Sequence, residues 1–256
     1  MKKLFIWLFL LPLTSFTQNT FDYGRSYSDT IPEKYILNVA KLREHIYVGV
    51  PSSLKRDWHE VMTYRFADEN AYQISNLLAS GQVYSDWLPL ENYLNEIFNK
   101  VIPKELKNDS MIHAYIIQDG DCNAFMTPSG YTFINIGLLA EVPNEAAIAG
   151  VLAHELGHYY LKHSLYTFIQ EETGEFDQGL LSYSNKPFYR YSQKQELQAD
   201  SLAIRWLQNS NYNLNGFNSF FETMRRLERN RIKRSENTWE LKATTHPLTD
   251  ETHMVE

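Results

Sequence analysis

Cysteine is almost absent from this sequence. Cys122 is the single cysteine among 256 residues, so no disulfide can form within the chain. The fold must therefore be held together by its hydrophobic core, with or without a bound metal. We expect Cys122 to behave as a small buried hydrophobic residue in or beside a strand. A role as catalytic nucleophile is disfavoured, because no histidine partner for it is identifiable in the sequence.

Positive charge is also scarce. The chain carries 24 lysines and arginines against 31 aspartates and glutamates, which gives a formal net charge of -7 at pH 7. Proteins that bind DNA or RNA normally present a basic face. The charge balance therefore argues against a nucleic-acid partner.

Long apolar runs are missing after the first residues. Lys2 and Lys3 give the N-terminus a positive start, and an apolar run over 4–13 precedes a few small residues. This order is typical of a signal peptide, which we expect over residues 1–17, with export of the chain to the periplasm or the extracellular space. The alternative is an uncleaved N-terminal anchor. The run is too short to span a bilayer, which takes about 20 residues. We expect no transmembrane span after the leader, although peripheral membrane contact stays possible.

The rest of the chain has the composition of a folded protein. Apolar residues make up 43% and aromatic residues 14%, which is enough for a sizeable core. Apolar residues at three- and four-residue spacing predict helices over 33–50, 52–80 and 86–103. The pattern then changes to runs rich in β-branched and aromatic residues. These runs predict two or three antiparallel strands over 111–136, with 122–126 as a short middle or edge strand.

The second half of the chain is expected to be mainly helical. One helix should start at the N-cap Asn144 and run to about His163. A long loop over 164–190 should follow. Two further helices are expected over about 190–209 and 214–231.

Predominant helices with one small sheet place the fold in the α+β class. The length of 256 residues allows one large domain or two small ones. We expect a single domain over 18–256, with a helical N-terminal part at about 33–103 and a catalytic core at about 111–250.

A motif typical of metal sites stands in the middle of an apolar helix. Residues 154–158 read HELGH and fit the pattern H-E-x-x-H. Residues four apart on an α-helix face the same way, so His154 and His158 have the separation that two imidazoles need to reach one zinc ion. Glu155 lies on the adjacent flank, close enough to take a proton from a metal-bound water as that water attacks a carbonyl.

The surroundings of the motif favour a metal site over two structural histidines in a core helix. The helix should be buried, and three ionisable groups there are costly unless they are paired or bound to metal. Catalytic zinc usually takes three protein ligands. The run QELQADSLAIRWL offers Glu196 as the third ligand on a second helix, and Asp200 one turn further on to hold the free ring nitrogen of a ligand histidine. The alternative is a solvent-exposed acidic face, which the apolar neighbours of this pair disfavour.

The two signatures together resemble a known family. The segment from NAF at 123–125 through HELGH to QELQADSLA is similar to the HtpX and CAAX prenyl endopeptidase family of zinc metalloproteases. The resemblance covers about 111–246. It implies a mainly helical zincin-like domain with a small antiparallel sheet beside the HExxH helix. It also implies one zinc ion per chain, with His154, His158 and Glu196 as the ligands. In the same resemblance, Glu155 is the general base and Asp200 is the carboxylate that supports a ligand histidine.

The resemblance also implies where a substrate would lie. Asn123, Ala124 and Phe125 would form an edge strand, to which the backbone of a substrate could add as an extra strand. Many members of the family have several transmembrane helices, whereas this chain is expected to have none after its leader. It therefore resembles the soluble, exported branch of the family, without the helical repeats that often follow in that branch.

A late histidine is the second candidate catalytic residue. The family has an H-P pair followed by an arginine; here His246 and Pro247 supply the pair, and Thr252 stands at the arginine position. His246 is a candidate to stabilise the transition-state oxyanion or to cap the zinc in a resting form. The alternative is a histidine in a surface loop. His163 lies five residues past His158, so we expect it to point away from the metal and to be structural.

These residues lead to the hypothesis of an exported zinc metalloendopeptidase that cleaves protein or peptide substrates, such as misfolded or envelope proteins. Two alternatives stay open. A zinc-containing, chaperone-like binding module could hold unfolded segments on its edge strand with little proteolysis, but it would not need a base such as Glu155. A structural zinc site would normally be closed by four ligands, mostly thiolates.

Overall fold

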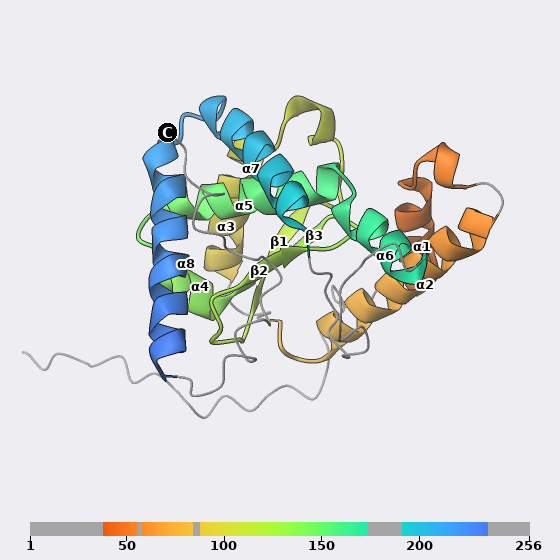
Figure 1. The fold of residues 1–256 in the computed structure, drawn as a ribbon, viewed down its shortest axis with the longest axis horizontal. Coiled ribbons are helices and arrows are strands. Elements are labelled where there is room, and N and C mark those ends of the chain that lie inside the picture. Colours follow the sequence, from red (N-terminus) through yellow and green to blue (C-terminus); the bar gives the residue numbers. More distant parts are fainter. Residues whose placement is uncertain (1–37, 56–57, 84–87, 174–190, 235–256) are drawn as a thin grey trace, which may run out of the picture. The chain divides into compact units, whose positions relative to one another are not determined.

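The computed structural model describes residues 38–55, 58–83, 88–173 and 191–234. The helices (Figure 1) are α1 (Val39–Val48), α2 (Trp58–Ala79), α3 (Leu88–Val101), α4 (Ile136–Glu141), α5 (Glu145–Tyr160), α6 (His163–Thr173), α7 (Gln193–Gln208) and α8 (Leu214–Arg234), with short 3-10 helices at Ser52–Leu54 and Lys104–Leu106. The strands are β1 (His113–Ile117), β2 (Ala124–Met126) and β3 (Tyr131–Asn135). The expected α+β class, with helices predominating, is confirmed.

The three strands form one mixed sheet in the order β1-β3-β2. β2 and β3 are antiparallel, with Phe125 opposite Phe133, whereas β1 and β3 are parallel, with Tyr115 opposite Phe133. The expectation of a purely antiparallel sheet is therefore wrong. β3 takes the centre of the sheet and separates β1 from β2, so β1 pairs with β3 and not with the strand that follows it in the sequence.

β2 is an edge strand among the described residues, which decides between the two positions expected for 122–126. The backbone N–H of Asn135 donates to the carbonyl of Asn123 at 3.0 Å. Bonded and non-bonded pairs alternate along antiparallel strands, so the backbone polar groups of Ala124 and Met126 point away from β3. The outer edge of the strand thus offers backbone groups to whatever lies beside it.

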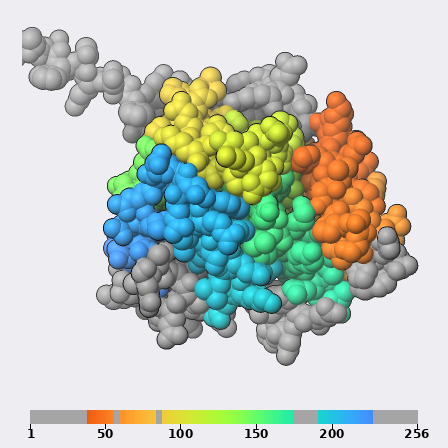
Figure 2. Space-filling model, turned by 90° about the horizontal axis from the view of Figure 1, so that it is seen from above, coloured from red at the N-terminus to blue at the C-terminus, as the bar shows by residue number. Residues whose placement is uncertain are grey.

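Two hydrophobic clusters hold these elements together. The larger joins α3, α5, α7, α8 and one face of the sheet, and the smaller joins α1, α2, α6 and the other face. Neighbouring residues of a strand point to opposite faces, so β3 sends Ile134 into the larger cluster and Phe133 into the smaller. Figure 2 shows α1 and α2, in orange, beside the green of the segment that contains α6.

The start of α5 agrees with the sequence analysis. Asn144 is its N-cap, and the side-chain oxygen of Asn144 accepts a hydrogen bond from the N–H of Ala147 at 2.9 Å. This bond satisfies one of the donors that the first turn of a helix leaves without a partner within the helix.

The helix that was expected to run to about His163 stops a few residues earlier, and a second helix begins at His163. α5 ends at Tyr160, and Lys162 has a positive φ of 56°, which no continuous α-helix contains. α6 then starts at His163. The expected loop over 164–190 is wrong for 164–173, because an apolar stripe of α6 packs into the smaller cluster; this stripe consists of Leu165, Phe168 and Ile169.

Several predictions fall outside the described residues and stay predictions. These are the leader over 1–17, the start of the first helix at 33–37, the remainder of the expected loop at 174–190, and the tail with His246 and Thr252. The division of the chain into a leader and one domain is therefore also still a prediction. Among the described residues, none of the helices combines the length and the apolar character that crossing a bilayer requires.

Candidate metal centre

α5, which carries the HELGH motif, packs against α7, α8 and the sheet, and Figure 1 shows it running next to α7. A glycine in the motif allows the close approach of α7. A Cβ atom on Gly157 would lie 2.9 Å from the Cα atom and 3.0 Å from the carbonyl oxygen of Ala199. Any side chain at this position would push the two helices apart. The glycine between the two histidines therefore brings α7 onto the motif.

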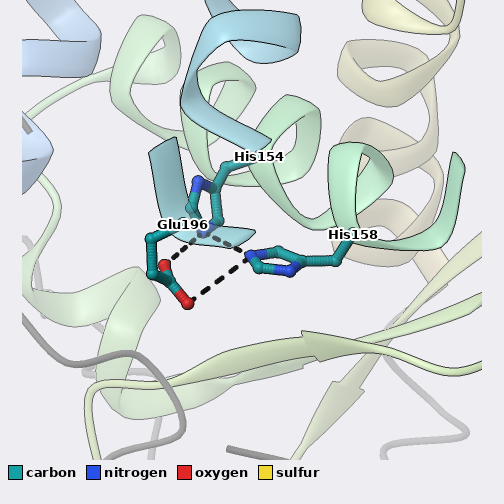
Figure 3. Close-up of side chains that lie close together, drawn as sticks. All are labelled: His154, His158 and Glu196. Atoms are coloured by element: carbon teal, nitrogen blue, oxygen red, sulfur yellow. Dashed lines mark hydrogen bonds and ion pairs between the residues drawn. The ribbon is translucent and has the colours of Figure 1, made fainter. Parts of the chain in front are cut away.

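His154, His158 and Glu196 converge on one point between α5 and α7 (Figure 3). The Nε2 atoms of the two histidines are 3.1 Å apart. Oε2 of Glu196 lies 3.3 Å from Nε2 of His154, and Oε1 lies 3.8 Å from Nε2 of His158. All three side chains are buried, and that of Glu196 is 0% exposed. The helix of Glu196 thus packs against the helix of His154, as expected.

These spacings fit a divalent metal ion. Four ligand atoms arranged tetrahedrally at about 2.0–2.1 Å from zinc lie about 3.3 Å from one another. The observed distances of 3.1, 3.3 and 3.8 Å lie around that value. Two imidazoles and one carboxylate also make up the protein ligands of one class of catalytic zinc site. A cation at this point would neutralise the fully buried carboxylate of Glu196.

Asp200 lies on the other side of the His154 ring. Its Oδ1 atom is 2.7 Å from Nδ1 of His154, and its side chain is almost entirely buried. Burial of His154 lowers its pKa, but the hydrogen bonds to Asp200 and Glu196 outweigh this effect and raise the pKa to about 10. The two carboxylates therefore favour a positive charge at this ring, and a metal cation at Nε2 would supply such a charge.

His163 does not point away from the candidate site, so that expectation is wrong. Its Nδ1 atom lies 2.9 Å from Nδ1 of His158, and its Nε2 atom lies 3.2 Å from Oε1 of Gln198. The expectation assumed one continuous helix, whereas the turn at Lys162 directs His163 back toward the motif. Burial lowers the pKa of His163 to about 4, so the ring is neutral at pH 7.

Tyr191 is a residue of the site that the sequence analysis missed. Its ring stacks on the ring of His158, with centroids 3.9 Å apart and planes 16° from parallel. The hydroxyl groups of Tyr191 and Ser164 are 2.8 Å apart and share a hydrogen bond. Nothing in the local sequence marks this tyrosine, because it reaches the site from the far end of a long connection to α7.

Glu155 is buried next to the cluster of three without belonging to it. Its Oε2 atom accepts a hydrogen bond from the backbone N–H of Met126 at 3.2 Å. That N–H is one of the groups that β2 directs away from β3. The expected general base therefore faces the strand that was expected to receive a substrate.

An apolar pocket lies beside His154, Glu155 and Glu196. Its apolar lining comes from α4, α5 and α8 and consists of Leu138, Val151, Phe220, Phe221 and Met224. The sequence analysis missed the contribution of α8. The sequence did contain a signal for it, because the apolar residues over 217–224 are spaced three and four residues apart and so share one face of a helix.

The first residue of β2 and the two residues before it also line this pocket. Cys122, Asn123 and Ala124 contribute to the lining, whereas Phe125 points to the other face of the strand and packs in the smaller cluster. Cys122 is half-buried, and its thiol donates to the sulfur of Met224 at 3.3 Å. Burial, together with nearby negative charge, raises the pKa of this thiol to about 11, so at pH 7 it is a neutral group beside a strand.

Comparison with known proteins gives a family match over part of the chain. Residues 90–182 match the family model described as Peptidase family M48. This segment contains the three strands and the HELGH motif, and it ends before Glu196.

Three curated relatives show how far the similarity extends. The mitochondrial metalloendopeptidase OMA1 of Schizosaccharomyces pombe is 23% identical over 193 residues, which cover 68% of this chain and 56% of the relative. The beta-barrel assembly-enhancing protease of Yersinia pestis is 23% identical over 202 residues, covering 70% and 40%. That of Escherichia coli K12 is 21% identical over 176 residues, covering 60% and 36%. The chain thus spans between about a third and just over half of the length of these relatives. The similarity to these proteins supports the expectation that the chain is a metalloprotease, which is a hydrolase.

Proposed function

We propose that this chain is a zinc-dependent metalloendopeptidase that hydrolyses peptide bonds of protein substrates. The observation that carries the proposal is the convergence of His154, His158 and Glu196 on one buried point, with Glu155 beside it. The similarity to peptidase family M48, and to proteins named as a metalloendopeptidase and a protease, supports it. Within that family, the likeness to the HtpX and CAAX prenyl endopeptidase branch rests on the sequence motifs alone.

His154, His158 and Glu196 would hold one zinc ion per chain. Bound there, zinc would polarise the substrate carbonyl and lower the pKa of water toward about 7. Asp200 would keep the proton of His154 on Nδ1, which leaves the lone pair of Nε2 directed at the point where Glu196 also arrives. We therefore propose the same roles that the sequence motifs imply: three zinc ligands, Glu155 as the base, and Asp200 as the supporting carboxylate.

Glu155 would act as the general base. Its carboxylate would take the proton of the attacking water and pass it to the departing amine, a role worth about 10²–10⁴ in rate. The hydrogen bond from Met126 holds one carboxylate oxygen and so fixes the orientation of the group before a substrate arrives. His246 remains a candidate to stabilise the oxyanion or to cap the site.

The outer edge of β2 would bind the substrate backbone. Its outward backbone groups belong to Ala124 and Met126, and the second of these already contacts Glu155. A peptide that adds to this edge as an extra strand would therefore pass next to the base. An apolar side chain of the same peptide could enter the pocket lined by α8.

We also propose that the enzyme acts after export, in the periplasm or outside the cell, on misfolded or envelope proteins. The leader over 1–17 supports export, and the relatives named beta-barrel assembly-enhancing proteases suggest envelope substrates. N-terminal sequencing of the protein recovered from a periplasmic or culture fraction tests the first part. A mature chain that starts at Gln18 is the expected result, and an uncleaved Met1 would contradict it.

The proposed activity is tested on the purified mature protein. Elemental analysis should give one zinc per chain, and casein should be digested by this sample but not after treatment with a chelator. Activity should return when zinc is added back. A gently purified protein without zinc, or casein cleavage that a chelator leaves unchanged, would contradict the proposal.

The variant Glu155→Gln separates an enzyme from a chaperone-like module that only binds unfolded segments on its edge strand. The change keeps the shape of the side chain and removes its basicity, so zinc and peptide should still bind while cleavage falls by about 10²–10⁴. Wild-type-like cleavage by the variant would mean that Glu155 is not the base. If neither form cleaves and both bind unfolded chains equally, the binding module is the better description.

A further inference from the structure

The two candidate histidine ligands differ in what lies behind them. Nδ1 of His154 faces the carboxylate of Asp200, whereas Nδ1 of His158 faces the ring of His163 at 2.9 Å. His163 is only 4% exposed, and its other nitrogen faces the exposed side chain of Gln198 at 3.2 Å. A line of hydrogen bonds therefore runs from the surface to the ring of His158.

We infer that His163, anchored by Gln198, is a positioning residue that fixes the tautomer and orientation of the ligand His158, the role that Asp200 has for His154. The inference rests on the proposed metal site, and it assigns a function to a histidine outside the H-E-x-x-H pattern.

The direction of each hydrogen bond follows from the ligand role of His158. A ligand nitrogen must present a lone pair, so Nε2 of His158 carries no proton and Nδ1 carries one. That N–H donates to Nδ1 of His163, which must then be the acceptor. A neutral His163 with its lone pair on Nδ1 carries its proton on Nε2. This second N–H donates to Oε1 of Gln198, and the chain of donors and acceptors closes without conflict.

The surrounding contacts hold His163 in place for this role. Nε2 of Gln195, on α7, donates to the carbonyl of His163 at 3.4 Å and to the hydroxyl of Thr167 at 3.1 Å. The first turn of α6 is thereby attached to the helix that also carries Glu196. Tyr191 stacks on the face of the His158 ring, so that ring is held through its face and through Nδ1.

The experiment compares two replacements of similar size. Leucine and asparagine both branch at Cγ, but only asparagine has an oxygen that can accept the N–H of His158. His163→Leu should weaken zinc binding by about 10–100-fold, the usual cost of losing a partner behind a ligand. His163→Asn should recover most of this loss. The measurement is the zinc dissociation constant from competition with a chromophoric chelator, with the thermal melt of each metal-free variant recorded beside it.

A milder change tests the outer end of the line. Gln198→Met keeps the length of the side chain and removes the acceptor for Nε2 of His163, and its exposed position leaves the core untouched. We expect a smaller loss of zinc affinity, of about 2–10-fold. NMR of ¹⁵N-labelled histidines in the zinc-loaded wild type should show a proton on Nδ1 of His158 and on Nε2 of His163.

The outcomes separate this inference from the proposed function. If wild type binds zinc and His163→Leu binds it equally well, the positioning role is overturned and the metal site stands. If His163→Leu and His163→Asn are weakened equally, His163 only fills space, and the inference is again overturned. If wild type binds no zinc at all, the proposed function fails and the inference fails with it.

Discussion

Oδ1 of Asp200 lies 2.7 Å from Nδ1 of His154, on the side of the ring opposite the atom that faces Glu196. Both carboxylates come from α7, one helical turn apart, so a single helix contacts both nitrogens of one imidazole. The four-residue spacing of Glu196 and Asp200 therefore places one candidate ligand and also fixes the position of the His154 ring. This relationship makes Asp200 the sharpest test of the site that does not remove a ligand.

Replacing Asp200 by alanine should weaken zinc binding or activity by about 10–100-fold, because His154 loses the acceptor that fixes its tautomer. Asp200→Asn should be affected less, since its amide oxygen can still accept the hydrogen bond. Ser201→Ala, at an exposed neighbouring position of the same helix, is the control and should behave as wild type. Unchanged affinity and activity in Asp200→Ala would mean that the carboxylate does not support the site.

Gly157→Ala should damage both the fold and the metal site, although alanine usually favours a helix by about 1 kcal/mol over glycine. The added Cβ would lie 2.9 Å from the Cα atom of Ala199, so α5 and α7 must move apart. We expect a loss of about 1–3 kcal/mol in the free energy of unfolding, as for other overpacked sites. Zinc affinity should fall as well, because Glu196 moves with α7.

Denaturant unfolding and zinc titration of Gly157→Ala check this prediction. Gly120→Ala is the matched control, because a Cβ there meets nothing within 4 Å. A Gly157→Ala protein as stable as wild type would show that the distance between α5 and α7 does not depend on the missing side chain at this position.

The parts of the site that local sequence could predict are those within single helices. His154, Glu155 and His158 follow from the geometry of one helix, and Glu196 with Asp200 from another. The family resemblance implied that these two helices pack against each other. The physical reason is Gly157, which lacks a side chain and so allows the close approach of α7. The parallel pairing of β1 and β3 could not be predicted, because β1 pairs with a strand that is not its neighbour in the sequence, and local sequence carries no signal for such a pairing.

His163 shows why residue spacing alone was misleading. Five residues past His158, it would point elsewhere on a continuous helix, but the positive φ of Lys162 interrupts that helix. Nothing in the residue type of Lys162 signals the interruption, since positive φ is uncommon outside glycine, asparagine and aspartate. Tyr191 was equally hidden, because its approach to His158 depends on the tertiary fold.

The acid side of the stability profile should depend on Glu145 in the first turn of α5. Hydrogen bonds from Tyr212 at 2.5 Å and Tyr93 at 2.6 Å, with Lys100 at 3.2 Å, lower the pKa of this carboxyl from 4.5 to about 2. A group whose pKa is lowered by folding stabilises the protein above its unfolded pKa. That contribution should be lost as the pH falls from about 4.5 to about 2.

The variant Glu145→Gln should therefore be less stable than wild type at pH 6, and the difference should shrink toward pH 2. Thermal melts over this pH range measure it. Glu60→Gln, an exposed glutamate in the first turn of α2, changes the same charge at another helix start and serves as control. A stability difference between wild type and Glu145→Gln that stays constant with pH would contradict the prediction.

Cys122 should react slowly with thiol reagents. The thiolate is the reactive form, and a pKa of about 11 leaves little of it at pH 8. We expect alkylation by iodoacetamide at pH 8 to be roughly 100-fold slower than for an unperturbed cysteine. The same protein unfolded in guanidinium should react at the ordinary rate, which serves as control. Native labelling as fast as in the unfolded state would show that the thiol is neither buried nor raised in pKa.

The pocket beside Glu155 should select the substrate side chain next to the cleaved bond. Its lining is mostly apolar, so we expect cleavage beside apolar residues to dominate in a peptide library. Met224 supplies part of the α8 wall, and Met224→Ala would enlarge the pocket while removing the sulfur that accepts the hydrogen bond from Cys122. One methylene in such a pocket changes discrimination by about 10–200-fold. The variant should therefore shift kcat/KM from leucine-sized toward aromatic side chains while zinc content stays at wild-type level.

Met62→Ala is the matched control for this change. Met62 is also a partly buried methionine, but it packs in the smaller cluster with α2, away from the pocket lining. Its replacement should cost stability similarly, because both variants lose one methionine side chain from apolar surroundings. It should leave the ratio of kcat/KM values for leucine and phenylalanine peptides as it is in wild type. If both variants shift this ratio equally, the effect comes from general loosening of the fold. If neither shifts it, the pocket does not hold the substrate side chain, and the peptide must pass β2 in another register.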